Sequence, residues 1–99
     1  YIYNITIKVE NHRVEEWKTW MKTIHISDVL ATGYFTDARL CHLMDDGDPN
    51  AETFVVQYTC NTIDDFEKYH LNNASQLQQE GKNKFGDDFI AFRTFMEII

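Results

Sequence analysis

The sequence has few basic residues for its length. Lysine and arginine together number 9 among 99 residues, against 16 aspartates and glutamates, so the formal net charge is −7. Nucleic-acid-binding proteins usually carry a basic patch, because neutralising phosphates supplies much of their affinity. An anionic membrane surface would also repel this chain. We therefore expect neither nucleic acid nor a membrane as a partner, and we interpret the acidic surface as solvated.

Long apolar runs and cysteine pairs are also missing. No run approaches the roughly 20 apolar residues of a membrane span, and the first ten residues alternate instead of forming the apolar block of a signal peptide. The cysteines, Cys41 and Cys60, lack CxxC spacing. They fall on opposite faces of the predicted sheet, so we expect free thiols, a reducing compartment and a cytoplasmic location.

Motifs that carry known chemistries are absent. Gly81 and Gly86 have the spacing of a phosphate-binding loop, but Asp87 and Asp88 stand where Lys and Ser or Thr are needed. The chain has neither GxSxG nor HExxH. The acidic turn at 45–50 lacks EF-hand spacing, and no two of the 4 histidines have the spacing of a helical metal pair. We therefore expect no metal and no cofactor, and the sequence identifies no catalytic residue.

The composition is that of one folded domain spanning residues 1–99. Apolar residues make up 43 % and aromatic residues 14 % of the chain, which is enough to fill a core at this size. No linker, repeat or low-complexity segment interrupts the order of predicted elements.

Strict alternation predicts strands at 1–10, 34–44, 51–60 and 89–99. A helical stripe of Val14, Trp17, Met21 and Ile24, with Trp20 beside it, predicts the first helix, with Asn11 as its N-cap. Thr62 and Asp65 resemble a capping box for a second helix, which carries Ile63, Phe66, Tyr69, His70, Ala74 and Leu77 on one face. This helix is expected to end near Gly81 or at Phe85.

The order β-α-β-β-α-β predicts a ferredoxin-like α+β fold: a four-stranded antiparallel sheet of order 4-1-3-2 with both helices on one face. We expect the more apolar side of each strand to face the helices, which would bury Phe92 and place Phe95 and Arg93 on the other, open side. That open side would combine polar residues with apolar ones, which favours a second sheet packed against it.

Two sets of site residues follow from this arrangement. The residues expected at a dimer interface are Ile2, Leu43, Val55 and Phe95. The polar residues expected to converge as a ligand site on the same face are Asn4, Thr6, Arg39, Gln57, Thr59 and Arg93. His25 is expected at the end of the first helix, where the helix dipole favours a cation, or in a packing role; a general base at a pocket mouth is the alternative. Trp17, Trp20 and Met21 are interpreted as core or dimer surface, with a ligand cavity between helix and sheet as the alternative.

Four segments carry a resemblance to a known family: Tyr1-Ile2-Tyr3-Asn4, Trp17-Lys18-Thr19-Trp20-Met21, the run from His25 to Gly33, and the run from Phe85 to Thr94. Together they resemble the domain-of-unknown-function family numbered 4286, a family of short bacterial proteins. The resemblance implies a dimeric α+β barrel, in which two ferredoxin-like sheets pack face to face. It implies no activity, substrate or catalytic residue.

We therefore expect a homodimer that either binds a small molecule at the sheet–sheet interface or is a structural dimer, in which the same polar residues form a hydrogen-bonded or ion-paired interface. Two alternatives remain open. One is a cofactor-free enzyme, by analogy with dimeric-barrel monooxygenases and isomerases, with His25, Tyr58 and Cys41 as the candidate bases. The other is a protein-interaction module that uses its acidic surface.

Overall fold

The computed structural model describes residues 1–99. The strands are β1 (Ile2–Glu10), β2 (Asp37–His42), β3 (Ala51–Thr59) and β4 (Phe89–Met96). The helices are α1 (Val14–Trp20), α2 (Ile26–Ala31), α3 (Ile63–Tyr69) and α4 (Ser75–Phe85). A 3₁₀ turn, Asn11–Arg13, precedes α1, and π turns at Met21–His25 and His70–Ala74 join α1 to α2 and α3 to α4.

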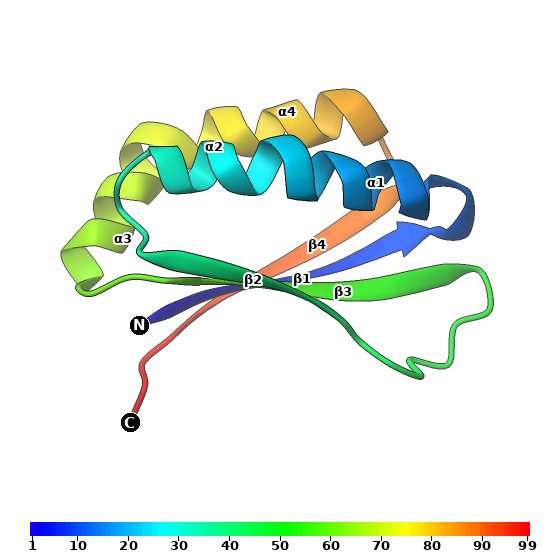
Figure 1. Ribbon diagram of the computed structural model, residues 1–99, viewed down its shortest axis with the longest axis horizontal. Coiled ribbons are helices and arrows are strands. Elements are labelled where there is room, and N and C mark those ends of the chain that lie inside the picture. The colour runs from blue at the N-terminus through cyan, green and yellow to red at the C-terminus, as the bar shows by residue number, and fades with distance from the viewer.

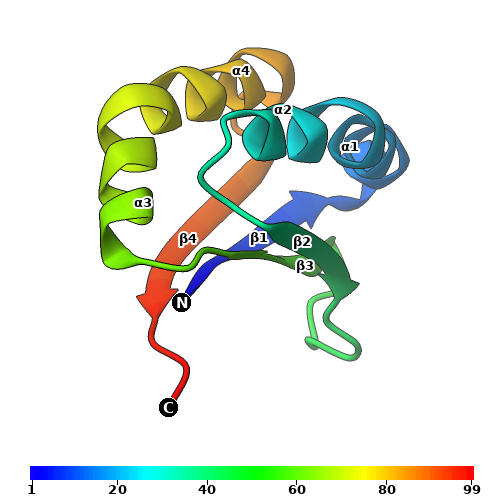
Figure 2. The same cartoon turned by 60° about the vertical axis from the view of Figure 1, so that its left-hand side comes forward.

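The strands form one antiparallel, four-stranded sheet in the order β2-β3-β1-β4, and all the helices lie on one face of it (Figure 1, Figure 2). The predicted ferredoxin-like fold is therefore confirmed. We call the side under the helices the covered face and the other side the open face. The central strand β1 buries Tyr3, Ile7 and Val9 on the covered face, where removal of apolar surface from water supplies the main stabilisation.

Each π turn changes the phase of its helix, because an i→i+5 turn holds one residue more than an α-helical turn. The 3.6-residue repeat predicts Ile24 on the buried stripe, but Ile24 is 48 % exposed and His25 instead stacks on Trp20. In the second helix, the buried residues Tyr69 and Ala74 stand five positions apart across the other π turn. Figure 2 shows the second helix changing direction between α3 and α4.

The helix ends follow local chemistry. The Thr62 hydroxyl accepts a hydrogen bond from the Asp65 backbone N–H at 3.0 Å, which confirms the predicted cap of α3. Helix α4 ends at Phe85, and Gly86 follows with φ of 57°, a conformation that favours glycine. The predicted N-cap at Asn11 is wrong: Asn11 begins the 3₁₀ turn, and its side-chain amide donates to the Pro49 carbonyl at 2.9 Å.

Strand β4 presents the opposite side to the one predicted. In its register with β1, Arg93 lies opposite Ile5 and Phe95 lies opposite Tyr3, so both belong to the covered face. Phe95 stacks on Phe66 at 4.1 Å between ring centroids, and Phe92 is 65 % exposed on the open face. The prediction failed because the open face of this strand is more apolar than the covered one.

The thiols lie as predicted. Cys41 is exposed on the open face, Cys60 is buried under the helices, and both are free.

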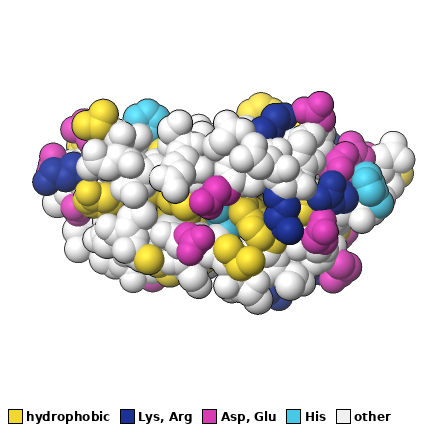
Figure 3. All heavy atoms as spheres, turned by 90° about the horizontal axis from the view of Figure 1, so that it is seen from above, with side chains coloured by type: hydrophobic (Ala, Val, Ile, Leu, Met, Phe, Trp, Pro, Cys, Tyr) yellow, Lys and Arg dark blue, Asp and Glu magenta, His cyan; other side chains and the backbone are white.

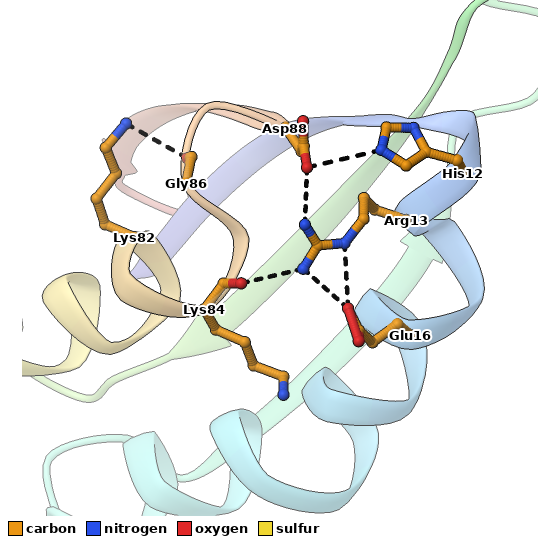
Figure 4. Close-up of polar contacts among 7 residues, drawn as sticks. All are labelled: His12, Arg13, Glu16, Lys82, Lys84, Gly86 and Asp88. Atoms are coloured by element: carbon orange, nitrogen blue, oxygen red, sulfur yellow. Dashed lines mark hydrogen bonds and ion pairs between the residues drawn. The ribbon is translucent and has the colours of Figure 1, made fainter.

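A cluster of polar contacts around Arg13 joins the first helical segment to the last one (Figure 4). The Arg13 guanidinium pairs with Glu16 at 2.9 Å and with Asp88 at 2.7 Å, and it donates to the Lys84 carbonyl at 3.0 Å. It also lies 4.8 Å from the centre of the Phe85 ring. The start of α1 is thus held against the end of α4.

Candidate functional site

A partly open cavity of about 50 Å³ lies between the covered face and the helices. One water molecule needs roughly 10–15 Å³, so this space can hold about three to five waters or a ligand of a few heavy atoms. The wall is largely hydrophobic, and it is formed by Tyr3, Ile5, Ile7, Trp17, Trp20, Met21, His25, Val29, Tyr58, Tyr69, Leu77, Gln78, Gly81, Phe85, Phe89, Ala91 and Arg93. An apolar cavity with a few polar groups is the common form of a small-molecule site.

The π turns place polar side chains in this wall. His25 is the last residue of the first π turn, and Tyr69 directly precedes the second one. Such turns occur often at functional sites, because they break the regular repeat of a helix. If the same sequence formed an uninterrupted α-helix, the 3.6-residue repeat would turn His25 away from the centre of the buried stripe.

His25 is held in its neutral form. Burial lowers the pKa of His25 to about 4, with a smaller lowering from the cation of Arg93 and an opposing effect from Asp28. Its ring stacks on Trp20 at 4.5 Å, and its Nδ1 atom is buried without a hydrogen-bond partner. The prediction of a cation at a helix end is therefore wrong, since the helix continues through the π turn to Ala31, whereas the predicted packing role agrees with the stack on Trp20.

The cavity wall contains three tyrosines, Tyr3, Tyr58 and Tyr69, one from each of β1, β3 and α3. Burial raises the pKa of each phenol, so all of them are hydrogen-bond donors at neutral pH. Tyr58 is 1 % exposed, and its hydroxyl has no hydrogen-bond partner. An unpaired buried hydroxyl is costly, so this atom marks a place where a partner is missing.

Arg93 stands at the mouth of the cavity. Its side chain lines both the cavity and a surface groove of about 330 Å³, and Gln78, Phe89 and Ala91 are also common to the two hollows. The mouth therefore lies between β4 and α4. The guanidinium and the Gln78 amide oppose the rise in the pKa of Tyr3 that burial causes, so both lie beside that hydroxyl.

The open face has a different chemistry. Its apolar side chains include Ile90 and Phe92, which are 58 % and 65 % exposed. Across its middle runs a polar row, Arg39, Gln57, Asn4 and Thr94, in which the Gln57 amide donates to the Asn4 carbonyl oxygen at 3.1 Å. The residues of this row are at least partly accessible and form no enclosed cavity.

The residues predicted as one ligand site therefore separate into two groups. Asn4, Thr6, Arg39, Gln57 and Thr59 lie on the open face as predicted. Arg93 and His25 belong to the cavity on the other side of the sheet. Sequence reasoning placed Arg93 on the wrong face because it assigned the side of β4 by apolarity alone.

The predicted interface set changes in one member. Ile2 and Val55 lie on the open face by register, and the backbone N–H of Leu43 continues the pairing of β2 with Thr53 of β3. Phe95 lies on the covered face, so the prediction that places it at an interface is wrong. Phe92 occupies the open face in its stead.

The sequence did not identify some of the residues that line the cavity as site residues. Alternation places Tyr3 on the covered face, but nothing in the sequence distinguishes it from a core tyrosine. Tyr69 and Gln78 carry no pattern that would link them. Trp17, Trp20 and Met21 belong to the core and also line the cavity, so both interpretations of that cluster describe part of its role.

No group of three or more His, Cys, Asp or Glu side chains is placed to hold a metal ion. In the acidic turn, Asp48 pairs with Lys8 at 2.8 Å, and the Asp46 carboxylate accepts a hydrogen bond from the Thr53 hydroxyl. None of the helices is both long and apolar enough to cross a membrane.

Several solved structures share this fold. An ethyl tert-butyl ether D (EthD) family protein from Bacillus halodurans has a TM-score of 0.62 at 5 % identity, covering 98 % of this chain and 100 % of that one. A Nitrosomonas europaea protein with the provisional name antibiotic biosynthesis monooxygenase has 0.60 at 11 %, covering 97 % and 98 %. A dimeric ferredoxin-like protein from an uncultured marine organism has 0.62 at 9 %, covering 100 % and 99 %.

At these identities the structural matches show a common fold alone. No curated protein matches the sequence significantly. The family model described as domain of unknown function, DUF4286, matches residues 1–99. The resemblance found in the sequence is thus confirmed, and this chain belongs to the DUF4286 family.

Proposed function

We propose that this protein is a homodimer in which each chain binds a small molecule in the cavity between its sheet and its helices. The observation that carries the binding site is the pair of unpartnered buried atoms, the Tyr58 hydroxyl and Nδ1 of His25, in residues of one cavity wall. Leaving a buried polar group unpaired costs about 1–3 kcal/mol. A ligand with its own polar group, or ordered water, would relieve that cost.

This location replaces the sheet–sheet interface as the proposed binding site. On the open face Gln57 donates to Asn4, and Asn4 donates to Thr6, in positions that water also reaches, whereas the cavity holds buried polar atoms with no hydrogen-bond partner. A neutral imidazole and phenols in one cavity wall also keep the cofactor-free enzyme as a second candidate, because both kinds of group can exchange protons with a substrate.

The dimer is supported by the open face. A four-stranded sheet cannot leave Ile90, Phe92 and Leu43 in water without cost, and exposed apolar surface of this kind commonly marks an interface. The hairpin between β2 and β3 and the C-terminal segment both extend to the side away from the helices, at the borders of this face (Figure 1, Figure 2). The name of one structural relative describes it as dimeric.

The acidic-module alternative has less support. On the helix-covered side of the molecule, acidic and basic side chains are interspersed with apolar ones, and no broad field of one sign is visible (Figure 3).

Mass spectrometry of small molecules that co-purify with the protein tests the binding site. We expect a compound enriched over a boiled control in the wild type and lost in Ala91→Phe, which fills the mouth. Ser75→Phe is the matched control, because Ser75 lines the outer groove but not the cavity. Equal retention by both variants would place the ligand outside the cavity.

Light scattering coupled to size exclusion tests the dimer. We expect twice the chain mass of 11.7 kDa for the wild type and a monomer for Phe92→Asp, since burying unpaired charge costs several kcal/mol. Leu71→Asp is the control, because Leu71 is also apolar and exposed but lies on the helical side, in the π turn between α3 and α4. A monomeric wild type at micromolar concentration would contradict the proposed dimer and leave the cavity proposal intact.

A further inference from the structure

We propose that the cavity binds a short, uncharged amide of about three to five non-hydrogen atoms. This inference rests on the proposed function, because it names the ligand class of the same cavity. Its basis is the volume of the cavity, the lack of charge in its interior, and two unpartnered polar atoms that come from opposite walls.

The volume of the cavity limits the size of the ligand. A space of about 50 Å³ has room for about three to five non-hydrogen atoms, as it has for the same number of waters. The surrounding core is tightly packed, since Trp17, Tyr58 and Phe85 of the wall are at most 2 % exposed. A larger ligand would have to displace these side chains, and a packed core resists such a change.

The interior of the cavity favours an uncharged ligand. The wall contains no aspartate or glutamate, and its one arginine, Arg93, is exposed and also lines the outer groove, so its charge stays in contact with water. Burial raises the pKa of Tyr3 although Arg93 opposes this shift, and burial lowers the pKa of His25. The cavity thus disfavours charge of either sign on its own groups, and a buried ligand ion would meet the same cost.

Two polar atoms determine which groups the ligand needs. The Tyr58 hydroxyl comes from β3 in the sheet, Nδ1 of His25 comes from the π turn in the helical layer, and neither atom has a hydrogen-bond partner. The hydroxyl can donate to a carbonyl oxygen, and Nδ1 of a neutral imidazole that is protonated on Nε2 can accept from an N–H. An amide carries this acceptor and this donor on separate atoms, so one small molecule can bind to both walls.

A pair of matched probes tests the selection for an uncharged ligand. Acetamide and acetate have nearly the same size and shape, and only acetate is charged at neutral pH. NMR titrations, with the Trp20 indole and the Gly81 amide as reporters of the cavity wall, give both affinities. We expect saturable binding of acetamide that is at least about tenfold tighter than that of acetate, because burying an unpaired charge is costly.

Two tyrosine variants test the hydrogen bond. Tyr58→Phe should weaken the binding of acetamide about fivefold, the effect of losing one hydrogen bond. Tyr34→Phe is the matched control and should bind acetamide like the wild type, because the Tyr34 hydroxyl lies outside the cavity wall and accepts from the Asn72 amide at 3.3 Å. Xenon enters apolar cavities and needs no hydrogen bond, so it should bind to the wild type and to both variants alike.

The xenon titration separates failure of this inference from failure of the proposed function. If xenon shifts the cavity signals, the inference is overturned by a lack of acetamide binding, by acetate binding as tightly as acetamide, or by acetamide binding that Tyr58→Phe leaves unchanged. The cavity would then still be a binding site. If xenon, acetamide and acetate all leave the cavity signals unchanged, the cavity admits no ligand, and the proposed binding function fails as well.

Discussion

The two faces of the sheet differ in what covers their apolar side chains. Each presents apolar side chains around polar ones, but on the covered face the chain's own helices enclose them, and on the open face nothing in the chain does. On the open face the Gln57 amide donates to Asn4 in a position that water also reaches. On the covered face the Tyr58 hydroxyl and Nδ1 of His25 are buried without a hydrogen-bond partner. This difference is the reason for proposing self-association through the open face and ligand binding in the cavity.

The largest contrast should come from the aromatic residues of the two faces. Trp17 is 2 % exposed and packs 4.9 Å from the Phe54 ring, so Trp17→Ala should destabilise the domain by about 3–5 kcal/mol. Phe92→Ala should cost the monomer about 0.5 kcal/mol, and any further loss should grow with protein concentration because it reports the dimer. Chemical denaturation at two protein concentrations measures both. Equal denaturation midpoints for Trp17→Ala and Phe92→Ala would contradict the difference between the covered and the open face.

The second contrast depends on pH. Because His25 has a folded-state pKa of about 4 against an ordinary 6.5, the unfolded chain takes up this proton first as the pH falls. The resulting stability is fully present above about pH 6.5 and is lost on acidification towards pH 4. Between pH 7 and 5 the loss should be about 2 kcal/mol.

His25→Asn should remove that part of the slope, and His12→Asn, at an exposed position, should keep it. The free energies of unfolding of wild type and variants at the two pH values provide the comparison. A wild-type slope that His25→Asn leaves unchanged would mean that another group titrates.

A smaller effect with the opposite sign is expected at Tyr58. Tyr58→Phe removes a hydroxyl that has no partner in the chain, so it should stabilise the unliganded protein by about 1 kcal/mol. Thermal and chemical denaturation of ligand-free protein measure this change. A destabilised variant would show that ordered water, or a retained ligand, occupies the cavity beside this hydroxyl.

The smallest effect is expected at Gln57, which follows Val56 and precedes Tyr58 in β3 and lies on the open face. Gln57 makes one partly exposed hydrogen bond to Asn4, so Gln57→Ala should cost about 0.5–1 kcal/mol in denaturation experiments. A larger loss that depends on protein concentration would assign the polar row to the dimer interface. A large loss that is independent of concentration would show that the open face stabilises the monomer.

Regular repeats made most of the fold predictable. Period-two alternation identified the strands, and a helical stripe identified α1, because each repeat follows directly from backbone geometry. Thr62 and Gly86 marked helix ends for reasons that are local to those residues. The sheet order follows once these elements are arranged in sequence.

The site was less predictable, because it depends on two departures from regularity. The rule that the more apolar side of a strand faces the helices fails for β4, where an uncovered apolar face competes with the core, so Arg93 and Phe92 were exchanged between faces. The 3.6-residue repeat fails inside the π turn, so it selects Ile24 where His25 lies. Neither departure is visible in one sequence, since no local residue type marks it.

The π turns also decide where this chain can gain or lose residues. Removing Thr23 from the turn Met21–His25 would restore an uninterrupted α-helix without rotating the residues that follow, because the π turn already accommodates one extra residue. Val29 would therefore stay buried, and the cavity would keep that part of its wall. The same deletion in the exposed turn at 45–50 would shorten a surface loop at little cost. Removing a residue from a regular part of a helix would instead rotate everything after it by about 100°. Single-residue deletions are therefore tolerated in the π turns and between β2 and β3, and they are costly elsewhere in the helices.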